Sequence, residues 1–305
     1  MQTLCDPRRD VRWALGALAV GCGVAQASTP LIGIAFRDPN FGPATRLFDV
    51  DASTGLASIA RLTGADAISG IALRRDGTLF GWADEFANVN GSAVDGALVT
   101  IDRATGATTL IGDVSPFNSG ALSAEGDIDF DPITGDLFGV TSNNGVSLLF
   151  TIDTTTGANS EIGIVQQPGS DISGMAFDDG GDLWLLDTSF EFGDDRVSRL
   201  LRVDRTSGDV FETVTLSVAL GTVGGMDFDP ATGQLFIADG DLFGTNNLYT
   251  ADLFTGELTL VGSTGLDGAP FGFGGLSDIE FIPAPGGVAA LAMGLGLLAR
   301  RRREG

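Results

Sequence analysis

The chain of 305 residues contains no histidine and no lysine, and all 17 of its basic residues are arginine. Its two cysteines, Cys5 and Cys22, both lie near the N-terminus. The rest of the chain therefore lacks the groups needed for Ser-His-Asp or Cys-His catalysis, for Schiff-base lysines and for His/Cys zinc sites. The chemistry that remains is carboxylate acid–base catalysis and the binding of ions through oxygen, such as Ca²⁺.

Positive charge is scarce in the body of the chain. Three arginines lie within the first 27 residues and four lie at Arg300–Arg303, which leaves ten for the segment between them. That segment holds 37 of the 40 acids, so its net charge is −27. Such a surface repels phosphate backbones, which argues against a nucleic-acid partner. It favours solubility and attracts cations.

The N-terminus predicts export. Three arginines precede an apolar run from Trp13 to Ala25, and the run ends in Ala25-Gln26-Ala27. This pattern is typical of a secretory signal peptide. We therefore predict that signal peptidase removes residues 1–27 by cutting after Ala27.

A second apolar run, Gly287–Ala299, lies between Pro283-Ala284-Pro285 and Arg300–Arg303. As a helix it would span about 20 Å, which is short of the ~30 Å bilayer core. The positive-inside rule keeps the arginines cytoplasmic and the body on the far side of the membrane. Residues 283–305 are thus predicted to form a marginal inner-membrane anchor; the alternative is a helix packed on the body.

The order of these features resembles the PEP-CTERM sorting tail of exported bacterial proteins, with Ala284 where the family name implies Glu. The resemblance implies that an exosortase-type membrane protease reads the tail and cuts near the prolines. It also implies transient anchoring in the inner membrane, followed by delivery to the cell surface, the outer envelope or the extracellular matrix. The sorting-tail residues would be Pro283, Pro285, Arg300, Arg301, Arg302 and Arg303.

Between the two ends, one phrase recurs at a nearly fixed spacing. Its first copy reads LFDVDASTGLASIARLTG, and the copies begin at Leu47, Leu98, Leu149, Leu200 and Leu248. A second phrase, such as ISGIALRRDGTLFGWAD from Ile68, interleaves with the first. Each phrase consists of two alternating apolar runs joined by a turn that contains Gly, which is the pattern of a β-hairpin.

Two hairpins per repeat give four strands, and five repeats predict an all-β fold, a five-bladed β-propeller of four-stranded blades. PLIGIAF at residues 30–36 and LSDIEFIP from Leu276 are complementary half copies, so strands from both ends would share one blade and close the ring. The predicted domains are a signal peptide at 1–27, a propeller at 28–282 and a sorting tail at 283–305. The phrases resemble blade repeats of secreted bacterial proteins of unknown function.

A propeller of this kind has two unlike faces. The stereotyped glycine turns lie on one face and the longer, irregular loops on the other, where we expect a binding site. These loops mix aromatic residues with acids, which predicts a shallow site for a glycan, a peptide or a partner protein. The alternative is that the phenylalanines serve only to hold the loops in place. The candidate residues are Glu85, Phe86, Phe190, Glu191, Phe192, Asp194, Asp241, Phe243, Phe271 and Phe273.

The innermost strands carry a second candidate site. Their first and third positions are small or acidic and are expected to face the ring axis. Acids that converge there repel one another unless a cation or protons intervene, and Ca²⁺ would suit them. The alternative is a water-filled channel. The candidate metal ligands are Asp127, Asp129, Asp227, Asp278 and Glu280.

Together these patterns predict an exported, non-catalytic binding or structural module whose ligand is an unidentified glycan or protein. The alternative is an exported hydrolase or lyase that uses paired carboxylates on the loop face, with or without Ca²⁺. Geometry separates the two. An enzyme needs two acids about 5–10 Å apart in a concave, partly apolar pocket.

Overall fold

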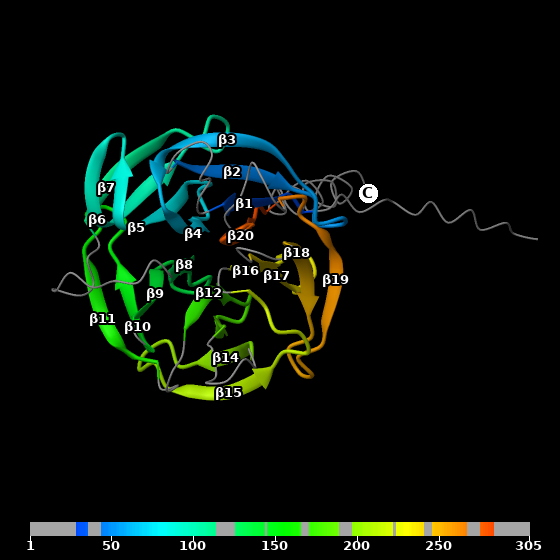
Figure 1. The fold of residues 1–305 in the computed structure, drawn as a ribbon. Helices are drawn as coiled ribbons and strands as arrows, with labels where there is room; N and C mark the ends of the chain where they lie inside the picture. The colour runs from blue at the N-terminus through cyan, green and yellow to red at the C-terminus, as the bar shows by residue number, and fades with distance from the viewer. Residues whose placement is uncertain are drawn as a thin grey trace, which may run out of the picture.

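A computed structural model describes residues 29–35, 44–113, 126–143, 145–165, 171–188, 197–221, 224–240, 246–266 and 275–283. Within these ranges the chain forms 20 β-strands and no helix. The strands form antiparallel blades set in a ring, which confirms the five-bladed propeller predicted from the repeat (Figure 1).

Each blade has four strands, which follow one another from the axis outward. Blade 1 contains β4 (Ile68–Leu73), β5 (Leu79–Val89), β6 (Ser92–Ile101) and β7 (Thr108–Asp113). Blade 2 contains β8 (Gly126–Phe130), β9 (Leu137–Asn143), β10 (Val146–Ile152) and β11 (Asn159–Ile164). Blade 3 contains β12 (Ile172–Phe177), β13 (Leu183–Asp187), β14 (Arg199–Val203) and β15 (Val210–Thr215). Blade 4 contains β16 (Met226–Phe228), β17 (Leu235–Asp239), β18 (Asn247–Ala251) and β19 (Leu258–Ser263).

Blade 5 closes the ring with strands from both ends of the fold, as predicted. Its members are β20 (Asp278–Phe281), β1 (Leu31–Ala35), β2 (Ala44–Val50) and β3 (Ala57–Asp66). The innermost strand β20 pairs with β1 in antiparallel register, Leu31 opposite Phe281 and Ile34 opposite Asp278 (Figure 1). The amide of Ile282 donates to Pro30 O at 2.7 Å and extends this ladder by one step.

Apolar side chains on facing sheets hold neighbouring blades together. Trp82 of blade 1 packs edge-to-face on Phe150 of blade 2, with ring centroids 5.1 Å apart. Phe236 of blade 4 meets Phe281 of blade 5 in the same way, also at 5.1 Å. Such pairs add about 0.5–1.5 kcal/mol to the free energy gained from burying their area. The core therefore lies between the blades, and the axis is left to polar groups.

An Asp-x-x-Thr-Gly sequence, with Ser207 in place of Thr in blade 3, forms the turn between the two outer strands of each blade. In blade 1, Asp102 Oδ1 accepts hydrogen bonds from the amides of Ala104 and Thr105, at 3.0 and 2.8 Å. Gly106 then takes a φ of +80°, which suits glycine. The same turn docks on the outermost strand of the preceding blade, because a Cβ on Gly106 would lie 2.6 Å from Leu62 O. This repeated sequence therefore both reverses the direction of the chain and packs against the neighbouring blade.

Gly256 offers a test of this double requirement. Its φ is +73°, and an added Cβ would overlap Thr215 O of the neighbouring blade. Gly135 has a similar φ of +79° but nothing within 4 Å of such a Cβ. We expect Gly135→Ala to cost about 1–2 kcal/mol of unfolding free energy, from backbone strain alone, and Gly256→Ala to cost about 2 kcal/mol more. Urea unfolding measures both; equal losses would contradict the docking role.

The segment from Asp84 to Gly96, expected to be an irregular loop, is instead a long hairpin, and that expectation was wrong. Strands β5 and β6 continue through it, with Glu85 opposite Asp95, so Glu85 and Phe86 lie in a strand. The hairpin turns at Asn90-Gly91, whose φ values are +51° and +83°. Asn-Gly is the strongest short sequence signal for such a two-residue turn.

Candidate functional site

The structure brings the five predicted axial acids together. Asp127 and Asp129 come from β8, Asp227 from β16, and Asp278 and Glu280 from β20. Asp127 and Asp278 form the deeper level, since both are almost completely buried. The remaining three form a second level nearer the glycine-turn face, where they line a cavity.

Each of these acids reaches from its own blade to the next blade in the ring and accepts a hydrogen bond from a backbone amide there. The donors are Met175 to Asp127 (2.7 Å), Phe177 to Asp129 (2.7 Å), Phe281 to Asp227 (2.6 Å), Ile71 to Asp278 (2.6 Å) and Leu73 to Glu280. The inner edge of an innermost strand faces the axis, where no further strand of the sheet pairs with it. The acids therefore satisfy buried amides that a sheet edge would otherwise leave unpaired.

Glycines make room for the deeper acids. Around the ring, the first inward-facing positions of the five innermost strands are Gly70, Asp127, Gly174, Gly225 and Asp278. A Cβ on Gly70 would lie 2.5 Å from Asp127 Oδ1, and one on Gly225 would overlap both Oδ1 and Cα of Asp278. Each buried acid thus sits against a glycine of the preceding blade. The small-or-acidic pattern in the sequence reflects this packing.

Burial raises the pKa of every one of these acids. The pKa values of Asp127, Asp227, Asp278 and Glu280 lie well above the ordinary range, first because of burial and then because of neighbouring carboxylates. Burial raises the pKa of Asp129 to about 7, while amide hydrogen bonds from Phe177 and Phe130 oppose the shift. Protons therefore relieve part of the repulsion that the sequence predicted at the axis.

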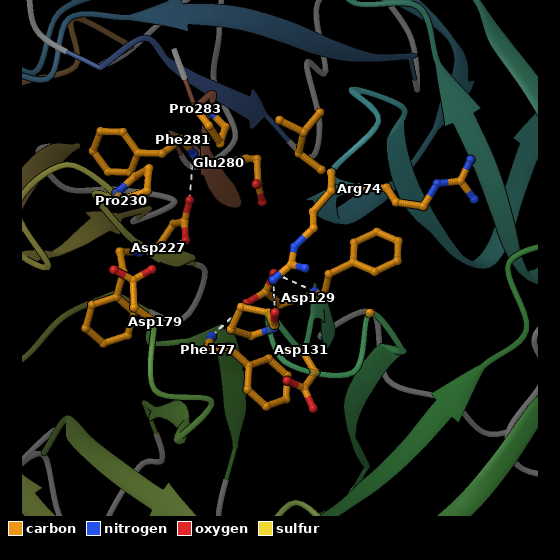
Figure 2. A pocket seen from close by; sticks show the side chains of 16 residues that line it. Arg74, Asp129, Asp131, Phe177, Asp179, Asp227, Pro230, Glu280, Phe281 and Pro283 are labelled. Atoms are coloured by element: carbon orange, nitrogen blue, oxygen red, sulfur yellow. Dashed lines mark hydrogen bonds between the residues drawn. The ribbon is translucent and has the colours of Figure 1, made fainter. Parts of the chain in front are cut away.

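The second level of acids forms the floor of a cavity of roughly 410 Å³ on the glycine-turn face. Asp129, Asp227 and Glu280 approach it from different blades, and the amide bonds of Phe177 and Phe281 to these acids are visible in Figure 2. The walls are largely apolar and consist of Leu73, Phe130, Phe177, Phe228, Phe281, Pro132, Pro230 and Pro283. The site is thus concave, partly apolar and floored with carboxyl groups.

This cavity lies on the glycine-turn face, whereas the sequence led us to expect a binding site on the opposite face, among the irregular loops. Its rim contains residues that were not among the candidates, including Arg75, Asp131 and Pro132. Arg75 Nη2 donates to Pro132 O and links the turns of blades 1 and 2. Asp131 is buried and pairs with Arg205 at 3.2 Å. A signal was available in the sequence: Asp-Pro-x-Thr-Gly occurs in only two of the five repeats, at Pro132 and Pro230, and both prolines line the cavity.

Calcium binding by the five acids stays a prediction. In the described part of the chain, no group of three or more His, Cys, Asp or Glu side chains is arranged to hold a metal ion. Thermal unfolding in millimolar Ca²⁺ and in EDTA tests the prediction, and an unchanged midpoint would contradict it. A midpoint that rises with Ca²⁺ and falls back with EDTA would show that a cation site exists.

Most candidates on the irregular face lie outside the described residues. This holds for Phe190, Glu191, Phe192, Asp194, Asp241, Phe243, Phe271 and Phe273, and also for Ala27, Pro285 and Arg300–Arg303. Pro283 is described and lines the cavity. A search of the described residues finds no helix long and apolar enough to span a bilayer.

No protein-family model and no curated protein matches this chain. Among solved structures, an engineered GH43 glycoside hydrolase with endo-xylanase and exo-arabinofuranosidase activity aligns with a TM-score of 0.48 at 10% identity over 65% of this chain. The match spans only 42% of that enzyme. A protein of unknown function from Dyadobacter fermentans aligns with a TM-score of 0.46 at 13% identity over 84% of each chain. A periplasmic gluconolactonase from Pseudomonas aeruginosa gives 0.43 at 11% identity, over 84% of this chain and 100% of its own. Likenesses this distant carry no information about what the chain does.

Proposed function

We propose that this protein is an exported β-propeller that acts as a non-catalytic binding or structural module in the cell envelope or extracellular matrix. The observation that carries the proposal is the structural role of the five axial acids. All five accept amide hydrogen bonds across a junction between blades, so these carboxyl groups stabilise the ring. The result is a rigid platform with an acidic surface.

A binding assay against matrix components tests this proposal. The purified protein would be applied to an array of bacterial and plant glycans, and each positive glycan would be titrated by calorimetry and then analysed for cleavage products. Binding without products is the expected outcome. New reducing ends or unsaturated sugars would overturn the non-catalytic assignment.

The cavity favours one second candidate, a hydrolase or lyase. Asp129, Asp227 and Glu280 share a concave and partly apolar cavity, and a pKa of about 7 suits Asp129 to donate a proton near neutral pH. For such an enzyme, Asp129→Asn would lower turnover by about 100-fold or more, as expected when a general acid is lost. Activity would decline above about pH 7, because the protonated carboxyl is the active form. Asp136→Asn, which removes one exposed charge from the turn that follows β8, is the matched control.

Export and sorting form the remaining part of the proposal. Its support is the signal-peptide pattern before Ser28 and the tail that follows the closing strand. Mass spectrometry of protein recovered from the envelope of the producing cell tests it. The expected mature chain begins at Ser28 and ends near Pro283. A chain that retains residues 284–305 would contradict cleavage of the tail.

Removal of the tail should leave the propeller folded. The last ring-closing contact is the hydrogen bond from Ile282 to Pro30, so a chain ending at Ile282 keeps all the strands. We expect its thermal midpoint to lie within about 3 °C of the full chain, which corresponds to less than about 1 kcal/mol. A truncated chain that fails to give a cooperative transition would show that the tail contributes to the fold.

A further inference from the structure

Asp131 and Asp229 occupy the same position in two blades. Each follows the innermost strand of its blade, β8 in blade 2 and β16 in blade 4, and begins an Asp-Pro-x-Thr-Gly turn. Both are buried. Each carboxyl group accepts hydrogen bonds from the amide two residues later and from the threonine hydroxyl three residues later, at distances of 2.7 to 3.0 Å. The two acids therefore have matching local surroundings, and what the next blade contributes to each can be compared directly.

The next blade contributes an arginine to Asp131. Arg205 lies in the outer turn of blade 3, and its Nη1 atom is 3.2 Å from Asp131 Oδ2. The same nitrogen donates to Gly181 O, in the inner turn of blade 3, at 2.7 Å. At the equivalent position of blade 5, directly after the first acid of the outer turn, the residue is Ala52. The outer turn of blade 5 therefore brings no guanidinium to Asp229 from this position.

The start of the fold lies beside Asp229 instead. Leu183 and Leu31 are the first residues of β13 and β1, and each pairs with the phenylalanine that ends the innermost strand of its blade. Thr29, two residues before Leu31, thus takes the place that Gly181 has two residues before Leu183. The Thr29 hydroxyl donates to Asp229 Oδ1 at 2.8 Å. Among the described residues, the groups that donate to the Asp229 carboxyl are therefore neutral.

Burial makes this lack of a counter-ion costly for Asp229. A third acid at the same position, Asp178 in blade 3, faces a blade that carries Leu253 where Arg205 would be. Asp178 is only partly buried, so water can solvate its charge. Asp229 is only 9% exposed, and a charge that is removed from water without a counter-ion is unfavourable. Asp229 is therefore the acid at this position for which a cation is missing.

We propose that removal of the signal peptide supplies this cation. Hydrolysis of the Ala27–Ser28 peptide bond consumes one water and leaves a carboxylate on Ala27 and an α-ammonium on Ser28. That ammonium precedes Thr29 by one residue, which spans at most about 3.6 Å, so it can reach Asp229. It takes the role toward Asp229 that Arg205 has toward Asp131. This inference rests on the export part of the proposed function.

The pair would make ring closure depend on processing. In the precursor the nitrogen of Ser28 is a neutral amide, so the ion pair forms only after cleavage. Once formed, it joins the segment that leads into β1, in blade 5, to the turn that follows β16, in blade 4. The processed chain should therefore hold its closing blade more firmly than the precursor does.

Selective acetylation of the α-amino group tests the pair. The chain contains no lysine, so an amine-directed acetylating reagent finds a single amino group in a protein that begins at Ser28 and ends at Gly305. Acetylation keeps one N–H on this nitrogen and removes its charge. We expect it to lower the midpoint of thermal unfolding by about 3 °C, as the loss of one partly buried ion pair would in a domain of this size. An unchanged midpoint would overturn the proposal.

Two variants identify the acid that responds. Asp229→Asn removes the charge and keeps an oxygen acceptor, so acetylation of this variant should no longer shift the midpoint. The matched control Asp178→Asn removes the equivalent acid of blade 3 and should keep the shift of the wild type. A full shift in Asp229→Asn, or its loss in Asp178→Asn, would overturn the proposal.

A third variant tests the comparison with Arg205 and does not require Asp229→Asn to fold. Ala52→Arg places a guanidinium where blade 3 has Arg205, so acetylation of this variant should lower the midpoint by less than half of the wild-type shift. A full wild-type shift in Ala52→Arg would contradict the proposal.

These measurements use purified protein and do not depend on export. Mass spectrometry of the envelope protein tests the cleavage separately. A mature chain that begins at a residue other than Ser28 would overturn the inference for the natural protein, whatever the effect of acetylation.

Discussion

Gly225→Ala should abolish folding or lower the free energy of unfolding by about 3 kcal/mol or more, because the new methyl group cannot be accommodated. Its Cβ would overlap the Cα of Asp278, which is backbone and cannot move aside by changing rotamer. Relief would require blades 4 and 5 to separate. That separation would break the bond from Phe281 to Asp227, which spans the same junction.

Gly174→Ala is the matched control for this substitution. Gly174 occupies the equivalent position in blade 3, and its added Cβ would lie 3.2 Å from Gly224 O and 3.3 Å from Gly225 Cα. These contacts are tight but need a shift of only a few tenths of an ångström, so we expect a loss of about 1 kcal/mol or less. Guanidinium unfolding of the two variants gives the comparison. Similar losses would mean that contact with the acid-bearing strand is not what requires glycine.

The free energy of unfolding should fall as pH rises from about 5 to about 8, which is unusual for an acidic protein whose carboxylates make hydrogen bonds. The folded pKa of Asp129 is raised to about 7, so between its unfolded and folded pKa values the native state binds more protons than the unfolded state. The stabilisation contributed by Asp129 is fully present when pH lies below the pKa of this group in the unfolded chain. It is lost as pH rises through the pKa of the same group in the folded protein. Linkage gives up to about 4 kcal/mol for the whole shift, of which about 2.7 kcal/mol falls between pH 5 and pH 8, and roughly half of these values remains once partial exposure is allowed for.

Two controls separate this effect from general charge repulsion. Asp129→Asn should reduce the pH dependence by the share of Asp129 and leave that of the other four buried acids, whereas Asp136→Asn, which removes an exposed charge in the same blade, should leave it nearly unchanged. Added salt screens repulsion between surface charges but acts much less on buried groups. Urea unfolding across the pH range measures the slope. A slope that vanishes in about 0.5 M salt would assign the effect to the surface instead of the axis.

The sequence allowed the ring to be predicted because its information is local and repeated. Five copies of Asp-x-x-Thr-Gly, one of them with Ser207 in place of Thr, give the number of outer turns, and the half copies around Ile34 and Ile279 give the closure. The inward direction of Asp127 and Asp278 also follows from alternation along a strand. Their partners could not be predicted in this way, because a bond from Ile71 to Asp278 spans 207 positions and depends on how two blades are offset.

The cavity was missed for a related reason. Its walls come from turns that look alike in sequence, and only the ring places Pro132, Pro230 and Pro283 around one opening. The hairpin at Asn90-Gly91 is a different case, since its two-residue turn signal was legible in the sequence.

The adjacency of Pro30 and Ile282 has a consequence for orientation. The chain enters and leaves the ring at the same point, and the exit residue Pro283 stands on the rim of the cavity. A propeller held by residues 283–305 would therefore hang from its glycine-turn face, with the cavity turned toward the bilayer and the irregular loops toward the outside. Cleavage of the tail would then release the protein from the membrane. It would also make the cavity lined by Asp129, Asp227 and Glu280 accessible to large ligands.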